Sequence, residues 1–460
     1  MAEAPPTSRL ARTGRVGGLV AGQGLRWAGT RAANLVRSPE RADAATGERA
    51  AALARELVEQ LGRMRGAAMK IGQVLSTVDF TAIPEAEREQ FKRTLATLRD
   101  DVPPLPFGKV EKLVRSELGG PVSAHFAEFE EQAFAAASIG QVHRAVTRDG
   151  DAVAVKVQYP GVAEAVEIDL RNLGLLLPLV KRLAPGLDVR ALATELRERV
   201  AEELDYEIEA ANHRTVARAW RGHPFAHVPA VHTDLSGRRV LVTELLEGAR
   251  FEEVKQLGAA ERDRFGEIVF RFFFGTLTHL GRASGDPHPG NYLLLADGRV
   301  GFLDFGLMRA VDPGYLAAEH AVARAAAAGD AGAVHRGMAQ LGYLPEPAEF
   351  DPERLLEQLL TGAEWYFEPG ARRITPAYVT ALMERSHDFI DDLRRMTLPP
   401  QALLIRRMEG LVFQTLGEVR ASADWAAIGA EYHAGEQPST ALGRHDRAFW
   451  GDRRPLARAA

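Results

Sequence analysis

The stretch SGDPHPGNYLLLADGRVGFLDFGLM, residues 284–308, decides how the rest of the chain is interpreted. It holds Asp286, then Asn291 five positions later, and then Asp304 at the start of an Asp-Phe-Gly triplet. Mg²⁺ prefers oxygen ligands, and in proteins a few side chains hold it together with the phosphates of a nucleotide. The spacing therefore predicts that Asn291 and Asp304 hold a metal ion, while Asp286 receives or orients a nucleophile.

The residues between these side chains predict a β-hairpin. Two short apolar runs, 292–295 and 300–303, are separated by Ala-Asp-Gly-Arg at 296–299, and Asp-Gly is a strong hairpin signal. Such a hairpin returns Asp304 to the side of Asn291. An ordinary hairpin with surface acids is the plainer interpretation. The ordered set of Asp, Asn, hairpin and Asp-Phe-Gly favours the arrangement that protein kinases use.

A phosphate-binding loop is predicted upstream, at residues 134–142. The sequence Phe-Ala-Ala-Ala-Ser-Ile-Gly-Gln-Val aligns with the kinase glycine-rich loop at its last Gly and its Val. Alanine stands at the other two glycine positions and does not adopt positive φ cheaply, so the loop should be stiffer. The residues predicted to contact the nucleotide here are Ala135, Ala136, Ala137, Ser138, Gly140 and Val142.

The next strand carries the lysine that this chemistry needs. Residues 152–157, Ala-Val-Ala-Val-Lys-Val, alternate as a strand and place Lys156 to pair with the α- and β-phosphates. A kinase also needs a glutamate to hold that lysine, but the helix expected at 189–220 offers too many acids to choose by chemistry alone. Residues 241–248 are the expected hinge between lobes, with Glu244 and Leu246 at the adenine.

Composition limits the remaining possibilities. A chain of 460 residues needs more than one core, and a net charge of −5 gives no case for nucleic acid as a partner. There is no cysteine, so disulfides and thiol chemistry are excluded. The first residues lack a signal-peptide core, and no apolar run is long enough to span a bilayer, so we expect a cytoplasmic protein. Residues 1–45 are rich in Arg and Gly, and the interpretation stays open between an arm on an anionic membrane surface and a partly disordered arm.

Several motifs together resemble the UbiB/AarF family of atypical protein-kinase-like proteins, which is linked to isoprenoid-quinone biosynthesis and lipid homeostasis. The resemblance spans about residues 50–430. It rests on Lys-Ile-Gly-Gln at 70–73, Ala-Ala-Ala-Ser-Ile-Gly-Gln-Val-His-Arg-Ala at 135–145, Glu-Leu-Asp-Tyr at 203–206, Asp-Pro-His-Pro-Gly-Asn at 286–291 and Asp-Phe-Gly at 304–306.

The resemblance implies a helix folded over the nucleotide cleft, where it blocks the usual protein-substrate surface. Lys70 and Gln73 would then reach the active site from this helix, with Glu203 and Asp205 as its polar partners. Because Lys70 and Gln73 are three positions apart, they share one face of the helix.

The resemblance also assigns the partner of the strand lysine. Glu209, one turn past Asp205, falls where the family's partner for that lysine lies, so we pair Glu209 with Lys156. The alanine-rich loop implies slow ATPase activity and suppressed protein phosphorylation. The sequence departs from the family at Ser284, where a histidine usually stands two residues before the catalytic Asp.

The predicted protein is thus α+β, a two-lobed protein-kinase-like fold with an N-terminal helical extension packed over the active site. The expected segments are a basic arm (1–45), the extension (46–120), the N-lobe with its acidic helix (121–247), the C-lobe (248–434) and a polar tail (435–460).

The predicted function is that of an atypical kinase-like ATPase that binds ATP and Mg²⁺. It hydrolyses ATP or phosphorylates a small or lipid-like molecule, such as an isoprenoid-quinone precursor, at the inner face of a membrane. One alternative is a phosphotransferase of the aminoglycoside- or choline-kinase type, and another is a non-catalytic, ATP-gated lipid-binding scaffold. The sequence leaves the choice between monomer and homodimer open.

Overall fold

The computed structural model describes residues 26, 33–34, 37–62, 80, 83–96, 105–137, 139–183, 193–194, 197 and 204–451. By their packing, these residues form two compact units, each taken by itself below. Unit 1 comprises the described residues of Met1–Glu207 together with His232–Val242, and unit 2 comprises Ile208–Val231 together with the described residues of Thr243–Ala460.

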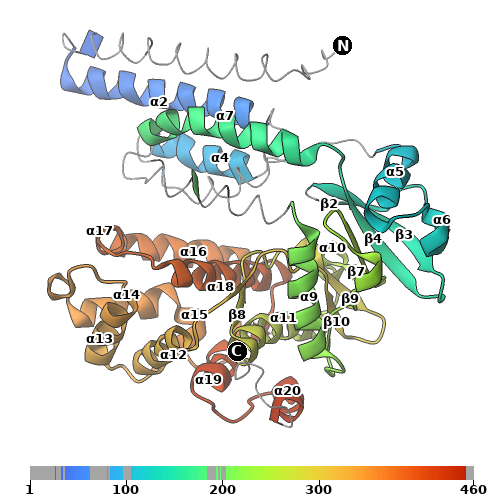
Figure 1. The fold of residues 1–460 in the computed structure, drawn as a ribbon. Coiled ribbons are helices and arrows are strands. Elements are labelled where there is room, and N and C mark those ends of the chain that lie inside the picture. Colours follow the sequence, from blue (N-terminus) through green and yellow to red (C-terminus); the bar gives the residue numbers. More distant parts are fainter. Residues whose placement is uncertain are drawn as a thin grey trace. The chain divides into compact units, whose positions relative to one another are not determined.

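Unit 1 is built on an antiparallel sheet in the order β1-β3-β4-β6, and β2 pairs with residues 140–142 of β3 on the side away from β4. The alternation predicted for 152–157 is confirmed, because Val153, Val155 and Val157 point into the core and are buried. The helix α5 covers them with Val110 and Val114, and Figure 1 shows it beside the strands. The elements are α2 (Pro39–Gly62), α4 (Glu85–Ala96), α5 (Phe107–Leu118), α6 (Val122–His125), β1 (Phe126–Phe129), β2 (Ala135–Ala137), β3 (Gly140–Thr147), β4 (Ala152–Gln158), α7 (Val162–Leu183), η1 (Thr233–Leu235) and β6 (Val240–Glu244), whose last residues belong to unit 2.

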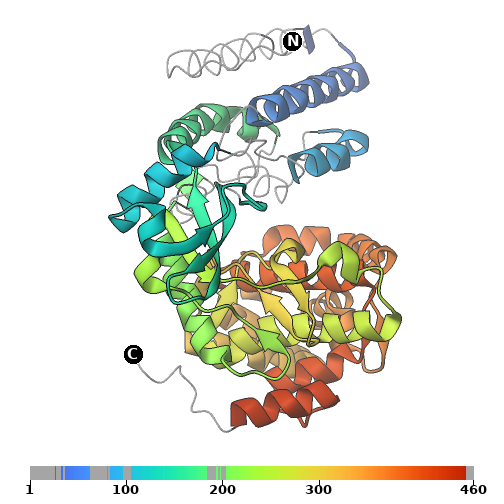
Figure 2. The ribbon, with the colours of Figure 1, turned by 90° about the vertical axis from the view of Figure 1, so that its right-hand side faces the viewer.

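Unit 2 is organised around one helix, α11 (Ala259–Leu280), whose residues 265–277 are all buried. A helix that is apolar on every side must be covered on every side. A small sheet in the order β5-β10-β9-β7 covers one side, and helices cover the rest. Figure 2 shows the orange and red helices of this unit packed beside its yellow strands.

The first half of unit 2 contains α9 (Tyr206–Trp220), which starts in unit 1, then β5 (Ala226–His227), β7 (Gly248–Arg250), α10 (Phe251–Val254), α11, β8 (Arg282–Ser284), η2 (Pro289–Asn291), β9 (Tyr292–Leu295), β10 (Val300–Phe302) and β11 (Met308–Ala310). The second half contains α12 (Pro313–Ala327), α13 (Ala331–Leu341), η3 (Pro347–Glu349), α14 (Pro352–Gly362), α15 (Glu364–Phe367), β12 (Arg372–Arg373), α16 (Pro376–Ser386), η4 (His387–Phe389), α17 (Ile390–Arg395), α18 (Pro400–Val419), β13 (Ser422–Ala423), α19 (Trp425–His433) and α20 (Ala441–Gly451).

The acidic helix differs from its prediction in two ways. Residues 193–194 and 197 are helical but Leu204 and Asp205 are not, and α9 begins at Tyr206, where the Asp205 carboxylate accepts the N–H of Glu207. Residues 208–231, expected in the N-lobe, group with unit 2 instead. Their apolar side chains, Trp220 above all, pack in the unit 2 core, where the Trp220 indole donates to Thr276 of α11.

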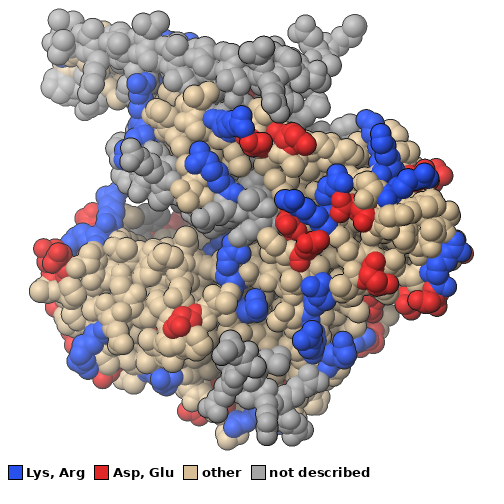
Figure 3. All heavy atoms as spheres, in the orientation of Figure 1, with Lys and Arg blue, Asp and Glu red and all other residues tan. Residues whose placement is uncertain are grey.

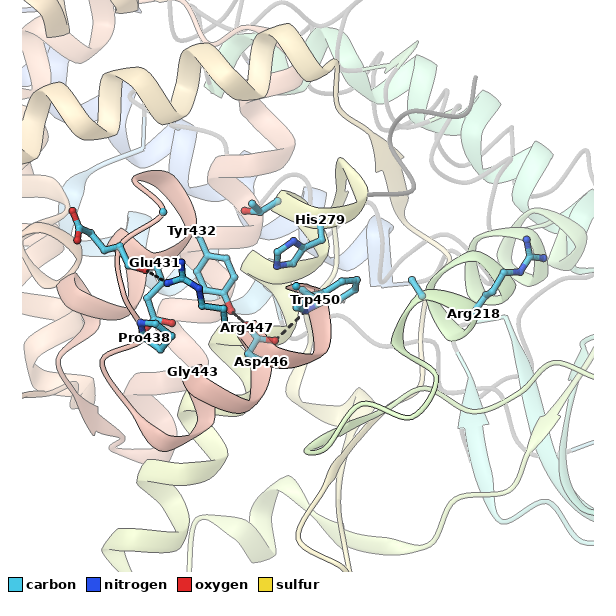
Figure 4. Close-up of a pocket in the computed structure, with 14 residues that line it drawn as sticks. Arg218, His279, Glu431, Tyr432, Pro438, Gly443, Asp446, Arg447 and Trp450 are labelled. Carbon is cyan, nitrogen blue, oxygen red and sulfur yellow. Dashed lines mark hydrogen bonds between the residues drawn. The ribbon is translucent and has the colours of Figure 1, made fainter. Parts of the chain in front are cut away.

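The expected polar tail, residues 435–460, contains an ordered helix: residues 441–451 form α20, with Leu442 and Asp446 buried. Asp446 explains why this polar segment is ordered, since its carboxylate accepts hydrogen bonds from Tyr432 at 2.8 Å and Trp450 at 3.1 Å. Figure 4 shows Tyr432, Trp450 and His279 gathered near Asp446, at the edge of a cavity of about 580 Å³. A buried carboxylate that accepts several hydrogen bonds thus holds this segment in place.

Within the part of the chain that the structure describes, no helix has an apolar stretch sufficient to cross a bilayer. The predicted packing of residues 46–120 over the active site relates one unit to the other, and residues 63–79 of that segment lie outside the described residues. That arrangement therefore stays a prediction.

Candidate active site

Strand pairing before Asp286 and a capped turn after it hold the loop that carries this residue. β8 and β11 are antiparallel, with Ser284 opposite Met308, and the N–H of Gly285 donates to the carbonyl of Leu307 at 2.6 Å. Beyond Asp286, the His288 ring accepts the N–H of Gly290, and this cap starts the short turn η2 that ends at Asn291. The chain thus holds Asp286 and Asn291 on one tight, internally bonded loop.

The predicted hairpin is confirmed. β9 and β10 are antiparallel, with Tyr292 opposite Phe302, and Gly298 adopts a φ of +81° in the connecting turn. The N–H of Leu303 donates to the carbonyl of Asn291 at 3.0 Å, so the strand that leads into Asp304 is bonded to Asn291 itself. The hairpin therefore brings the two predicted metal ligands, Asn291 and Asp304, close together.

The Asp-Phe-Gly segment is held by its own backbone and by α9. The Asp304 carboxylate accepts the N–H of Gly306 at 2.9 Å, which sets the orientation of that side chain. Phe305 is buried with its ring 4.5 Å from the ring of His213, and its carbonyl accepts from the side chain of Asn212 at 3.3 Å. These two α9 residues were missed in the sequence, although they lie one turn past Glu209 and so share its face of the helix.

Glu209 lies at the same place. Its side chain is 6% exposed, and a Cβ added at Gly306 would lie 3.8 Å from a Glu209 carboxylate oxygen. Within unit 2, Glu209 therefore points towards the Asp-Phe-Gly segment. Its predicted partner Lys156 belongs to unit 1, and the pairing of the two stays a prediction.

Asp286, Asn291 and Asp304 line one small cavity of about 10 Å³, close to the volume of a single water-sized probe. Tyr292 lines it too: burial raises the pKa of its phenol well above the usual value, and the charge of Asp286 raises it further. Among the described residues, no three His, Cys, Asp or Glu side chains form a metal-binding group. The oxygen donors here are two carboxylates and an amide, a set that suits a hard divalent cation completed by phosphate oxygens.

Ser284 occupies the position where the family usually has a histidine, and other contacts hold the loop at this position. Ser284 is buried in β8, and its hydroxyl accepts the N–H of Asp286 at 3.4 Å. From α18, the guanidinium of Arg407 donates to the carbonyl of Gly285 at 2.7 Å. Arg407 was not predicted, because nothing in its local sequence indicates a contact 122 positions away. Together with the β8–β11 pairing, these bonds brace the catalytic loop.

The alanine-rich loop in unit 1 joins two antiparallel strands, β2 and β3. Ala137 lies opposite Gly140 between β2 and β3, and Val142 lies opposite Lys156 between β3 and β4. A Cβ at Gly140 would lie 2.3 Å from the carbonyl oxygen of Val157, which is closer than any real contact, so only glycine fits. Ser138 lies outside the described residues.

Lys156 has an aromatic neighbour that the sequence analysis did not assign. Its ammonium lies 4.8 Å from the centre of the Tyr206 ring, and Tyr206 is buried in unit 1. A cation over an aromatic face is stabilised electrostatically, which holds the lysine head at the end of β4. Tyr206 is the last residue of the Glu-Leu-Asp-Tyr motif, so this motif contributes to the lysine site within unit 1.

Asp205, the other described acid of the Glu-Leu-Asp-Tyr motif, makes contacts that stabilise the local structure. Asp205 starts α9 and has a carboxylate oxygen 3.6 Å from the Arg238 guanidinium. Its predicted contact with the Lys-x-Gly-Gln helix is untested, since Lys70, Gln73 and Glu203 lie outside the described residues.

One of the places where the chain passes from unit 1 to unit 2, between Val242 and Thr243, lies within the segment 241–248 that was expected to be the hinge. The Glu244 carboxylate accepts from the His227 ring and from the N–H of Ala230, both at 3.1 Å, and the bond from His227 lowers the pKa of Glu244. Its side chain is thus used inside unit 2. It stays a prediction that the backbone of Glu244 or Leu246 contacts adenine.

The chain is similar in sequence to a known protein family and to several of its members. A model of the ABC1 atypical kinase-like domain matches residues 97–336, just over half of the chain. The rat protein "Atypical kinase COQ8B, mitochondrial" is 35% identical over 341 residues, which are 74% of this chain and 64% of the relative. "AarF domain-containing protein kinase 1" of Xenopus tropicalis is 34% identical over 240 residues, 50% of this chain and 43% of the relative. The chain thus covers less than two thirds of the length of these relatives.

One solved structure covers more. The chain is similar to Rv3197 of Mycobacterium tuberculosis, solved in complex with erythromycin, with a TM-score of 0.61 and 32% identity. The similarity covers 82% of this chain and 95% of that protein. The mixed α+β, kinase-like fold expected from the motifs is confirmed, as is the resemblance to the UbiB/AarF family.

Proposed function

Because the chain belongs to the ABC1 atypical kinase-like family, we propose that it binds Mg²⁺-ATP and either hydrolyses it or transfers its γ-phosphoryl group to a small or lipid-like molecule. The observation that carries this proposal is the single small cavity lined by Asp286, Asn291 and Asp304. Asn291 and Asp304 would hold a Mg²⁺ ion, whose charge would offset the negative charge that develops during transfer.

Each residue then has one task. Asn291 and Asp304 supply the amide and carboxylate oxygens that hold the metal, and the Gly306 N–H keeps the Asp304 carboxylate turned towards the cavity. Asp286 accepts the proton of the attacking water or hydroxyl, or orients that group. Tyr292 stays protonated beside Asp286, because burial raises its pKa, so it adds no second negative charge there.

In unit 1, Lys156 contacts the α- and β-phosphates, and Glu209 of unit 2 pairs with Lys156 once nucleotide is bound. The tight β2–β3 hairpin around Gly140 supports a stiff phosphate loop and slow turnover. Lys70 and Gln73 approach the same phosphates from the N-terminal extension and exclude protein substrates.

The acceptor is the least constrained part of the proposal. A small or lipid-like molecule in isoprenoid-quinone or lipid metabolism, met by the chain as a peripheral protein at a membrane surface, follows from the family resemblance. The relative solved with erythromycin supports a bulky organic ligand rather than a protein one.

The decisive test is phosphate release from Mg²⁺-ATP by the pure protein, with and without anionic phospholipid vesicles. We expect lipid-stimulated release that falls by at least about 100-fold in Asp304→Asn, because removing one charge from a preorganised site costs roughly that much. Asp330→Asn is the matched control, since Asp330 caps α13 and asparagine caps a helix equally well.

Other outcomes separate the alternatives. Full release by Asp304→Asn would contradict the assignment of the site. Nucleotide binding without release, even with vesicles, would favour the ATP-gated scaffold. Fast phosphorylation of a soluble amino-alcohol or aminoglycoside would favour the small-molecule phosphotransferase.

A further inference from the structure

Unit 2 contains a second, larger cavity that shares no residue with the small cavity of Asp286, Asn291 and Asp304. Its volume is about 620 Å³, and the helices α11 to α19 all contribute residues to its lining. Aromatic and aliphatic side chains supply most of the lining, with Phe274, Trp365 and Phe413 among them. Small-molecule sites in proteins are mostly apolar and span about 300–1,000 Å³, so this cavity has the size and lining of one.

The lining carries one charged cluster. The Arg406 guanidinium forms an ion pair with Glu409 at 2.9 Å and donates a hydrogen bond to Glu319, and the Tyr343 hydroxyl donates to Glu319 at 2.6 Å. Glu319 is nearly buried, but 39% of the Arg406 side chain and 26% of the Glu409 side chain are accessible. Both line the cavity, so a ligand there can reach these two side chains.

The cluster has one cation for two carboxylates. Burial raises the pKa of Glu409 to about 6, so Glu409 is still mostly charged at pH 7. His320 and His433 also line the cavity, and burial lowers the pKa of each to about 4, so neither supplies a second positive charge. At neutral pH the cavity therefore presents a net negative charge on an apolar wall.

A glycine keeps the space beside this cluster open. Gly410 follows Glu409 in the middle of α18 and lines the cavity, and a Cβ added there would have no atom within 4 Å apart from the helix itself. Glycine weakens a helix, and no close packing requires it here. The consequence of the missing side chain is free volume next to the Glu409 carboxylate.

The rim of the cavity is apolar as well. Met383 on α16, Leu393 on α17 and Leu398 just before α18 line the cavity, yet each is more than 40% exposed. Figure 3 shows few charged side chains over the helices α14 to α17 on the face in view. Exposed apolar side chains that surround a cavity mark an entry for an apolar molecule.

We propose that this cavity binds a hydrophobic amine, a molecule with a long or bulky apolar body and one protonated nitrogen that contacts Glu409. The apolar wall accepts the body, and the protonated nitrogen supplies the cation that the Arg406 cluster lacks. An anionic head would be repelled by the Glu409 carboxylate, and Arg406 already forms ion pairs with Glu409 and Glu319. This site is additional to the nucleotide site and does not depend on it.

The test compares three probes that share a twelve-carbon chain: N,N-dimethyldodecylamine, dodecanol and dodecanoate. Binding to the full-length protein is measured by calorimetry at pH 7, below the concentration at which each probe forms micelles. We expect the amine to bind about tenfold more tightly than the alcohol, which is the gain from one charge-assisted hydrogen bond, and the carboxylate to bind most weakly.

Two variants locate the site. Glu409→Gln should weaken amine binding about tenfold and leave dodecanol binding unchanged, because only the charge is removed. Gly410→Leu should abolish binding of both probes without lowering the unfolding temperature, since the new side chain fills open space and leucine favours a helix. Glu418→Gln on the same helix is the matched control, because Glu418 is exposed and does not line the cavity.

Equal binding of the three probes, or amine binding that survives Gly410→Leu, would overturn the proposal. Tightest binding of dodecanoate would overturn the charge assignment. Gly410→Leu remains informative if Glu409→Gln fails to fold. Nucleotide binding by each variant, followed with a fluorescent ATP analogue, reports separately on the active site.

Discussion

At the scale of single residues, the environment of a side chain decides its chemistry more than its type does. Glu209 lies beside Gly306 of the Asp-Phe-Gly segment, whereas Glu117 on α5 holds the backbone and guanidinium of Arg239 at the surface of unit 1. Both are glutamates on helices, and only the packing around them separates a candidate active-site residue from a structural one.

His433 provides a pH test at this scale. Its pKa is lowered to about 4, mainly by burial and in smaller part by the nearby charges of His320 and Arg324. The unfolded chain, with a histidine pKa of about 6.5, therefore binds more protons than the folded chain between pH 6.5 and 4, and stability falls as the pH falls through that window. In His433→Gln, the free energy of unfolding should fall by about 2 kcal/mol less between pH 7 and 5 than in the wild type.

Denaturant titration at the two pH values measures this difference. His445→Gln is the control, since the His445 side chain is exposed on α20, and its acid response should match that of the wild type. An unchanged acid response in His433→Gln would show that His433 is not held neutral in the folded protein.

At the scale of elements, α11 is the common wall of the two cavities in unit 2. Phe272, Phe273 and Thr276 face the small cavity of the candidate active site, and Phe274 and Leu277 face the larger one. A buried helix has two such faces because its side chains repeat every 3.6 residues. Any shift of α11 is therefore felt by both cavities.

Arg271 ties this helix to the end of the chain. Its guanidinium is completely buried and donates to Glu267 at 2.7 Å, to Glu431 at 2.8 and 3.0 Å, and to Thr440 at 3.1 Å. Arg271→Leu leaves two buried carboxylates without their cation, so it should lower the free energy of unfolding by about 3–5 kcal/mol. It should also speed amide hydrogen exchange in α20.

Arg354→Leu is the matched control, because Arg354 is half exposed in its ion pair with Asp392 and water screens such a pair, so its loss should change the stability much less. Equal losses of stability in the two variants, measured by denaturant titration, would contradict the assigned role of the buried cluster.

At the scale of the whole molecule, the chain passes between the two units more than once. Ile208–Val231 belongs to unit 2 and is followed by His232–Val242, which returns to unit 1. Within unit 2, α9 supplies Val216 and Trp220 to the core, and β5 pairs in parallel with β10. Unit 2 is thus not a continuous C-terminal piece of the sequence.

This connectivity predicts how fragments behave. A fragment of residues 243–460 lacks α9 and β5. It therefore exposes the part of the core that Trp220 covers in the full chain, together with one edge of β10, and it should unfold without a sharp transition. A fragment of residues 204–460 retains both elements and should unfold cooperatively. Thermal melts followed by circular dichroism compare the two, and an equally sharp transition in the shorter fragment would contradict the division into units.

The sequence by itself determined the local elements around the site and the family of the fold. The spacing of Asp286, Asn291 and Asp304, the Asp-Gly turn between them and the alternation that ends at Lys156 act over a few residues, where backbone geometry and periodicity are sufficient. For the same reason, the hairpin β9–β10 could be predicted from its two apolar runs and the Asp-Gly turn between them.

Only the tertiary structure decided which distant residues meet. Arg407 reaches Gly285, Asp446 orders a polar tail as α20, and Gly410 opens a cavity beside Glu409. None of these residues carries a local signal, because each role depends on side chains that other helices bring to it. The volume of a cavity and the pKa of a buried acid are properties of the packing, and no single stretch of the sequence contains them.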